Sequence, residues 1–153
     1  GAGMTHGMKQ SPTEIAKEYL ASLRRSAAGE ASSIEYLDFW AVEIEYILPG
    51  LWPMAGVHTK AGHMETVAPM MESNVEGDRG GEPGAGLYAY EFIEEGNKVC
   101  VLARSRGRDG RGMPYMNTFC LWMEFNDDGK LVRYLDEADF SSSWQAYWGV
   151  HLE

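Results

Sequence analysis

The sequence is poor in cysteine and contains no long apolar run. Its only two cysteines, Cys100 and Cys120, lie far apart along the chain. Such spacing matches neither a metal-binding motif nor a disulfide framework, so we expect free thiols and a cytoplasmic protein. No stretch reaches the roughly 18 consecutive apolar residues of a membrane-spanning helix, and no signal peptide is evident. These absences argue against a disulfide-stapled secreted domain and against a helical membrane protein.

Basic residues are also few. The chain has 13 Lys and Arg residues against 23 Asp and Glu residues, which gives a formal net charge of −10. Binding to nucleic acids or to anionic membranes depends on clustered Lys and Arg, so neither partner is expected. The one basic stretch, residues 104–112, is short and broken by glycines. It fits a solvated hairpin tip, with contact to a small anion as the alternative.

What the chain does have is the composition of an ordinary globular domain rich in aromatic residues. Its 153 residues are 44% hydrophobic and include 5 Trp, 8 Tyr and 5 Phe. This length predicts a single domain, which we assign to residues 11–153. Residues 1–10 resemble a cloning scar or a disordered tail and are left out of the fold. The aromatic side chains suit either a cavity lining or plain core packing.

Three helices are predicted in the first half of the chain. Ser11 can act as an N-cap, and Glu14 completes a capping box, so the first helix should run to about Ala28. A second helix is predicted after Ser32, where the capping pattern is repeated, and a third spans residues 60–73.

Strands dominate the second half. Period-two alternation predicts strands at residues 42–48, 87–94, 98–106, 114–125 and 130–138. The pairs Gly96-Asn97 and Asp128-Gly129 predict hairpin turns between them. Helices grouped ahead of consecutive antiparallel strands indicate an α+β fold. We expect a cone-shaped, curved antiparallel sheet wrapped around three helices.

The alternation also predicts which side chains face the interior of this cone. From residues 114–125 the inward set is Tyr115, Asn117, Phe119, Leu121, Met123 and Phe125. From residues 130–138 it is Val132, Tyr134, Asp136 and Ala138. From residues 42–48 it is Val42, Ile44, Tyr46 and Leu48. If these faces converge, the polar groups of one apolar pocket are Tyr46, Tyr115, Asn117, Tyr134 and Asp136, and Ser105 can join them from the strand at 98–106.

Asp136 has two readings. It can pair with an arginine or cap a loop at a wet sheet edge, which is a purely structural role. Inside an apolar pocket its charged form would be disfavoured and its pKa raised, so it could exchange a proton near neutral pH. Tyr46 and Asn117 could then orient a substrate or stabilise its oxyanion, with Tyr115 and Tyr134 in contact with it. The catalytic prediction is therefore Asp136, Tyr46 and Asn117.

Three stretches of the sequence resemble the nuclear transport factor 2-like superfamily. They are "YILPGLWPMAGVHTKAGHMETV", "GRGMPYMNTFCLWMEFNDDGKLVRYLDEADF" and, within the latter, "RYLD". The chain is most similar to the SnoaL-like polyketide cyclases and to proteins like ketosteroid isomerase. The latter enzymes carry their base at the end of the first strand, where this chain has Ile47 and Leu48. Asp136, the Asp of "RYLD", instead matches the acid/base position of the SnoaL-like cyclases.

This resemblance implies a function as well as a fold. It implies a cofactor-independent isomerase, cyclase or dehydratase that acts on a hydrophobic, carbonyl-bearing small molecule such as a polyketide, terpenoid or steroid. His63 and His58 would lie near the place where such relatives open their pocket, and His63, rather than His58, is predicted to contact the substrate. The resemblance also implies a homodimer formed through the outer sheet face. The alternative is a non-catalytic ligand-binding or dimerisation module, because this superfamily hosts many activities.

Overall fold

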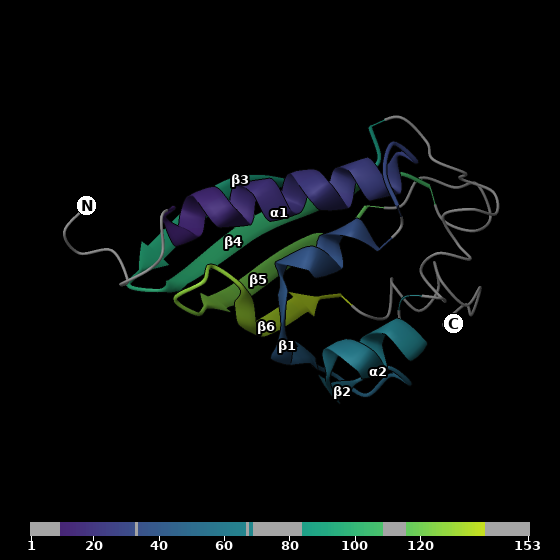
Figure 1. The fold of residues 1–153 in the computed structure, drawn as a ribbon. Coiled ribbons are helices and arrows are strands. Elements are labelled where there is room, and N and C mark those ends of the chain that lie inside the picture. Colours follow the sequence, from purple (N-terminus) through teal and green to yellow (C-terminus); the bar gives the residue numbers. More distant parts are fainter. Residues whose placement is uncertain (1–9, 33, 67, 69–83, 109–115, 140–153) are drawn as a thin grey trace.

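The computed structural model describes residues 10–32, 34–66, 68, 84–108 and 116–139. In it, α1 (Pro12–Ala27) lies along one end of a six-stranded sheet, and α2 (Lys60–Glu65) lies at the other end (Figure 1). The predicted third helix is α2, and nearly all of the rest of its predicted range is outside the described residues. Tyr115 and residues 1–9 are outside them as well. No helix within the described ranges is long and apolar enough to cross a membrane.

The first helix forms where its capping signals place it. The Ser11 Oγ atom accepts a hydrogen bond from the backbone N–H of Glu14 at 3.2 Å, as an N-cap does. Tyr19 and Leu20 on its inner face are each 1% exposed. The predicted second helix is instead a short 3₁₀ helix, η1 (Glu35–Phe39), which runs directly into the first strand.

The strands form one mixed sheet in the order β2-β1-β6-β5-β4-β3. Their bounds are β1 (Trp40–Leu48), β2 (Gly56–His58), β3 (Gly86–Glu95), β4 (Lys98–Arg106), β5 (Thr118–Phe125) and β6 (Leu131–Ala138). The predicted α+β class and curved sheet are confirmed, but β1 and β6 pair in parallel. Alternation within a strand carries no information about its direction, so only the hairpin-linked pairs could be predicted as antiparallel. The short strand β2 lies between the strand and the third helix predicted from the sequence, in a segment for which no element is predicted.

The two predicted hairpin turns are present. Gly96 and Gly129 have φ angles of 60° and 75°, in the left-handed region that glycine adopts without strain. These turns join β3 to β4 and β5 to β6 in antiparallel register.

Inward alternation is correct along β5 but breaks on β1 and β6. Val42 was predicted to face inward, yet it is 82% exposed, because the register with β6 shifts between Trp40 and Glu45. On β6, Leu131 is fully buried where Val132 was predicted, beside a second register shift. An irregularity of this kind inserts a residue and moves the following side chains to the other face. Each shift is a property of strand pairing, which one strand's sequence does not display.

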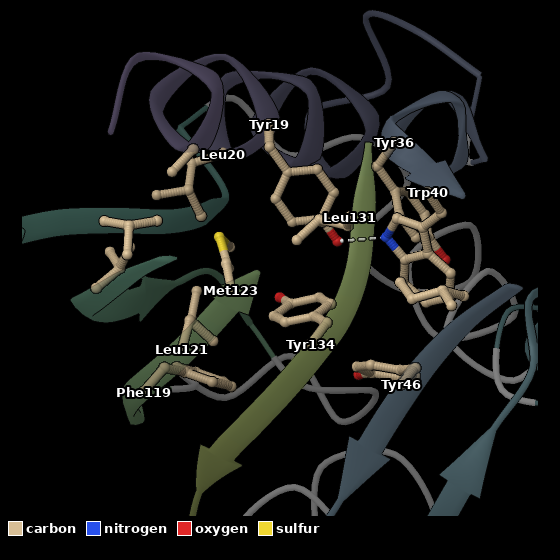
Figure 2. Packing of buried hydrophobic residues seen from close by; sticks show 14 of the residues in the cluster. Tyr19, Leu20, Tyr36, Trp40, Tyr46, Phe119, Leu121, Met123, Leu131 and Tyr134 are labelled. Atoms are coloured by element: carbon tan, nitrogen blue, oxygen red, sulfur yellow. Dashed lines mark hydrogen bonds between the residues drawn. The ribbon is translucent and has the colours of Figure 1, made fainter. Parts of the chain in front are cut away.

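Aromatic rings fill the space between α1, η1 and the sheet. Tyr19 from the helix meets Tyr134 of β6 edge to face, with ring centroids 5.6 Å apart, and Trp40 donates from Nε1 to the Tyr19 hydroxyl at 3.1 Å (Figure 2). Trp40 also lies 4.9 Å from the ring of Tyr46. Leu121 and Met123 of β5, both fully buried, continue this core toward β4. Aromatic and aliphatic side chains therefore make up most of this interior.

Candidate functional site

Asp136 and Tyr46 come together because β1 and β6 are neighbours. Tyr46 lies opposite Tyr134 in the parallel register, and Asp136 follows two residues later on β6. The Tyr46 hydroxyl donates a hydrogen bond to Asp136 Oδ2 at 2.9 Å. The structure thus joins two of the three predicted catalytic residues, and the bond links the neighbouring strands β1 and β6.

The second carboxylate oxygen of Asp136 has no such partner. The side chain as a whole is half-buried, but its Oδ1 atom is buried and has no hydrogen-bond partner within the described part of the chain. Burial is the largest effect on this carboxyl and raises its pKa from 3.8 to about 6; the Tyr46 hydrogen bond lowers the pKa, and the charge of Glu137 raises it. A carboxyl with this pKa changes protonation close to neutral pH, as a proton-transferring group requires.

Removing the Tyr46 hydroxyl tests this electrostatic arrangement. In Tyr46→Phe the hydrogen bond that favours the charged carboxylate is lost, so the pKa of Asp136 should rise above about 6. A carbon-13 NMR titration of the aspartate carboxyl groups measures this shift, with wild-type protein as the reference. An unchanged or lower pKa in the variant would show that the Tyr46 hydroxyl does not stabilise the charged form.

His63, which lies on α2, also contacts Tyr46. Thr59 caps this helix by accepting a hydrogen bond from the Gly62 N–H at 2.9 Å, and His63 is 1% exposed. The ring of His63 lies 5.2 Å from that of Tyr46 and 4.5 Å from that of Trp40. His58, at the end of β2, instead pairs its Nε2 atom with the Met54 carbonyl at 2.7 Å.

Tyr36 is a site residue that the sequence did not reveal. Its hydroxyl lies 2.6 Å from His63 Nε2, although the two residues come from η1 and α2. Burial, together with the smaller effect of the charge of His58, lowers the pKa of His63 to about 4, so the imidazole is neutral at physiological pH. The sequence showed Tyr36 only as one more aromatic residue near the second helix, with no signal of this contact.

Asn117 and Ser105 form a separate arrangement where β4 ends and β5 begins. The Ser105 Oγ atom accepts from the Asn117 backbone N–H at 2.7 Å. The Asn117 side chain donates from Nδ2 to the Asp139 carbonyl at 3.0 Å and accepts from the Thr118 N–H at 2.9 Å. These bonds hold the Asn117 amide against the backbone, which is a structural role common for an asparagine next to a strand.

Tyr134 is part of the buried aromatic core. It is 3% exposed and lies between the rings of Tyr19 and Tyr46. Burial raises the pKa of its phenol well above 10, so it stays protonated.

Among the described residues, no group of three or more His, Cys, Asp or Glu side chains is arranged to hold a metal ion.

The comparisons with known proteins bear on the fold. No protein-family model and no curated protein sequence matches the chain. Solved structures do. TerC, co-crystallised with polyporic acid, matches with a TM-score of 0.63 and 20% identity, over 88% of this chain and 98% of its own. An NTF2-like protein from Burkholderia thailandensis matches with a TM-score of 0.65 and 17% identity, over 90% and 97%.

This chain has the nuclear transport factor 2-like fold. A third structure with this fold is IdmH from Streptomyces antibioticus, described as a candidate polyketide cyclase. It matches with a TM-score of 0.64 and 17% identity, over 92% of this chain and 100% of its own. At these identities the likeness establishes the shared fold, and the chemistry has to be argued from the residues of this chain.

Proposed function

We propose that this chain is a cofactor-independent acid/base enzyme that moves a proton on the carbon next to a carbonyl group of a hydrophobic small molecule. The observation that carries the proposal is the buried, unpartnered Oδ1 oxygen of Asp136, whose pKa of about 6 lies near neutral pH. The names of structural neighbours agree with this class, since one is a candidate polyketide cyclase and another a candidate isomerase from Bacillus subtilis.

The proposed step is simple to balance. Asp136 Oδ1 takes a proton from the carbon beside the carbonyl, and the electrons of that C–H bond move into a carbon–carbon double bond while the carbonyl oxygen becomes an enolate. The carboxyl then returns the proton to the same carbon or to another carbon of the conjugated system. Isomerisation, cyclisation and dehydration all begin with this step. Tyr46 orients the carboxylate by holding its Oδ2 oxygen.

Deuterium exchange tests the proposal without knowledge of the natural substrate. In D₂O at pH 7, the wild-type protein should speed the incorporation of deuterium next to the carbonyl of 2-tetralone, a compact bicyclic ketone, above the buffer rate. Proton NMR follows the loss of the C1 signal. Polyporic acid, which was co-crystallised with TerC, serves as a competitor that should slow the exchange. No acceleration with 2-tetralone or with other cyclic ketones would contradict the proposed activity.

A second candidate is a non-catalytic binding or dimerisation module. The packing of Trp40, Tyr46 and Tyr134, whose side chains are at most 5% exposed, supports it because these rings occupy much of the interior. The same assay separates the two functions. A module would bind the ketone or leave it alone, but would not speed its exchange.

A further inference from the structure

A second buried polar atom, besides the Asp136 oxygen, has no partner within the described ranges. It is Nδ1 of His63. The imidazole is 1% exposed and is enclosed by the rings of Trp40, Tyr46 and Tyr36. A buried polar group that lacks a hydrogen bond is destabilising, so native proteins retain few such groups.

Tyr36 determines what this atom can do. A neutral imidazole has one N–H donor and one acceptor nitrogen. The Tyr36 hydroxyl lies 2.6 Å from Nε2, within hydrogen-bond distance, and a phenol O–H can donate to a neutral ring nitrogen. With Nε2 accepting this bond, the ring proton resides on Nδ1. His63 then presents a neutral N–H donor that no described residue uses.

The donor and the carboxylate share one neighbour. The Tyr46 hydroxyl holds Asp136, and the Tyr46 ring packs edge-on against His63. Both polar atoms therefore belong to side chains that contact Tyr46. The Tyr46 hydroxyl already donates its hydrogen bond to Asp136, and the Asn117 side chain is hydrogen-bonded to the backbone, so both donors predicted from the sequence are engaged.

We propose that His63 donates a hydrogen bond from Nδ1 to the carbonyl oxygen of the ligand, and that Tyr36 is the positioning residue that keeps the proton on Nδ1. The ligand class is a compact, largely apolar ketone with the oxygen as acceptor. As the carbon beside the carbonyl loses its proton to Asp136, negative charge develops on that oxygen, and the N–H group stabilises it. The charge-stabilising part of this role rests on the proposed function, whereas the hydrogen bond itself does not.

The test uses 2-tetralone labelled with carbon-13 at the carbonyl, with tetralin, which lacks the oxygen, as the control ligand. Wild-type protein should move the carbonyl resonance downfield on binding, as a hydrogen-bonded carbonyl does. In His63→Phe that shift should disappear, and Kd for 2-tetralone should rise roughly tenfold while Kd for tetralin stays the same. Circular dichroism and a melting curve verify that each variant is folded.

Three further variants separate a donor role from plain packing. His63→Asn places an amide N–H near the position of Nδ1 and should keep much of the shift, whereas His63→Gln reaches toward the position of Nε2 and should lose it. Tyr36→Phe should reduce the shift, because Nε2 loses the hydroxyl that fixes the proton on Nδ1. An unchanged carbonyl shift and Kd in folded His63→Phe would overturn the proposal, and so would equal Kd values of 2-tetralone and tetralin for wild-type protein.

A failure of the His63 hydrogen bond can be told apart from a failure of the proposed acid/base activity. In Asp136→Asn the deuterium exchange should stop while the carbonyl shift remains, because His63 and Tyr36 are untouched. A wild-type protein that shows the shift without exchange would contradict the acid/base activity and still support the His63 contact.

Discussion

Asp136→Asn should lower the rate of deuterium exchange into 2-tetralone by about 10²–10⁴-fold, the usual contribution of a positioned general base. Asparagine has nearly the same shape and cannot take the proton. Its amide oxygen can still accept the hydrogen bond that the Tyr46 hydroxyl now gives to Oδ2 at 2.9 Å. The packing around the site should therefore persist while its chemistry is lost.

The matched control is Asp128→Asn, which makes the same substitution in the exposed turn between β5 and β6. It should leave the exchange rate unchanged. Exchange by Asp136→Asn at the wild-type rate would remove Asp136 from the mechanism. A loss of exchange accompanied by a collapsed melting curve would instead give Asp136 a structural role.

Asp136 should also leave a signature in the pH dependence of stability. Its pKa in the folded protein, about 6, is raised above the ordinary value of 3.8, so the folded state binds this proton more tightly than the unfolded state does. The stabilisation of the folded state by protonated Asp136 is present in full below about pH 4 and is lost as the pH rises through 6. Relative to Asp136→Asn, the wild-type free energy of unfolding should fall across this window by up to about 3 kcal/mol.

How much of the fold was predictable depends on how local each signal is. The N-cap of α1 and the glycine turns at Gly96 and Gly129 involve neighbouring residues, and the structure has them where the sequence predicts. The inward face of β5 was also correct, because its alternation runs without a break. Val42 was wrong because a strand irregularity, which depends on the partner strand, resets the alternation, and Val132 is only half-buried beside a second irregularity.

The site follows the same logic. Asp136 and Tyr46 were predictable as neighbours because each lies on the inward face of its own strand and the fold brings the strands together. The contact between Tyr36 and His63 joins two short helical elements whose relative placement only the tertiary structure decides. Asn117 was predicted from its face alone, and strand periodicity cannot show that a side chain will turn back to the backbone.

Gly86→Ala should cost about 2–6 kcal/mol of folding free energy, the largest stability effect we expect from adding one methyl group. Gly86 opens β3 with a φ angle of 122°, a conformation that other residues rarely adopt, and strain of this kind costs about 1–3 kcal/mol. An added Cβ would also lie 2.8 Å from Cγ and 3.0 Å from Cα of Arg24 on α1. Forcing extra atoms into a packed contact costs a further 1–3 kcal/mol or so.

Gly96→Ala is the control that separates backbone strain from the steric contact between residue 86 and Arg24. Gly96 also has a positive φ angle, 60°, but an added Cβ would meet nothing within 4 Å, so that variant should lose only about 1–2 kcal/mol. Urea unfolding of both variants gives the difference in unfolding free energy. Equal losses would mean that backbone strain alone acts at Gly86.

Arg24→Ala tests which part of the helix is in the way. It removes the Cγ atom, together with the guanidinium that donates to the Leu87 carbonyl at 2.9 Å, but leaves the helix backbone in place. The double variant Arg24→Ala/Gly86→Ala should therefore recover only part of the unfolding free energy that Gly86→Ala loses. The added methyl group would still lie 3.0 Å from the Cα atom of residue 24. Full recovery would show that the flexible side chain, and not the helix backbone, requires glycine here. In that case Gly86 would be needed only to let the Arg24 side chain pack against β3. It would not determine how closely α1, which carries Tyr19, approaches β3.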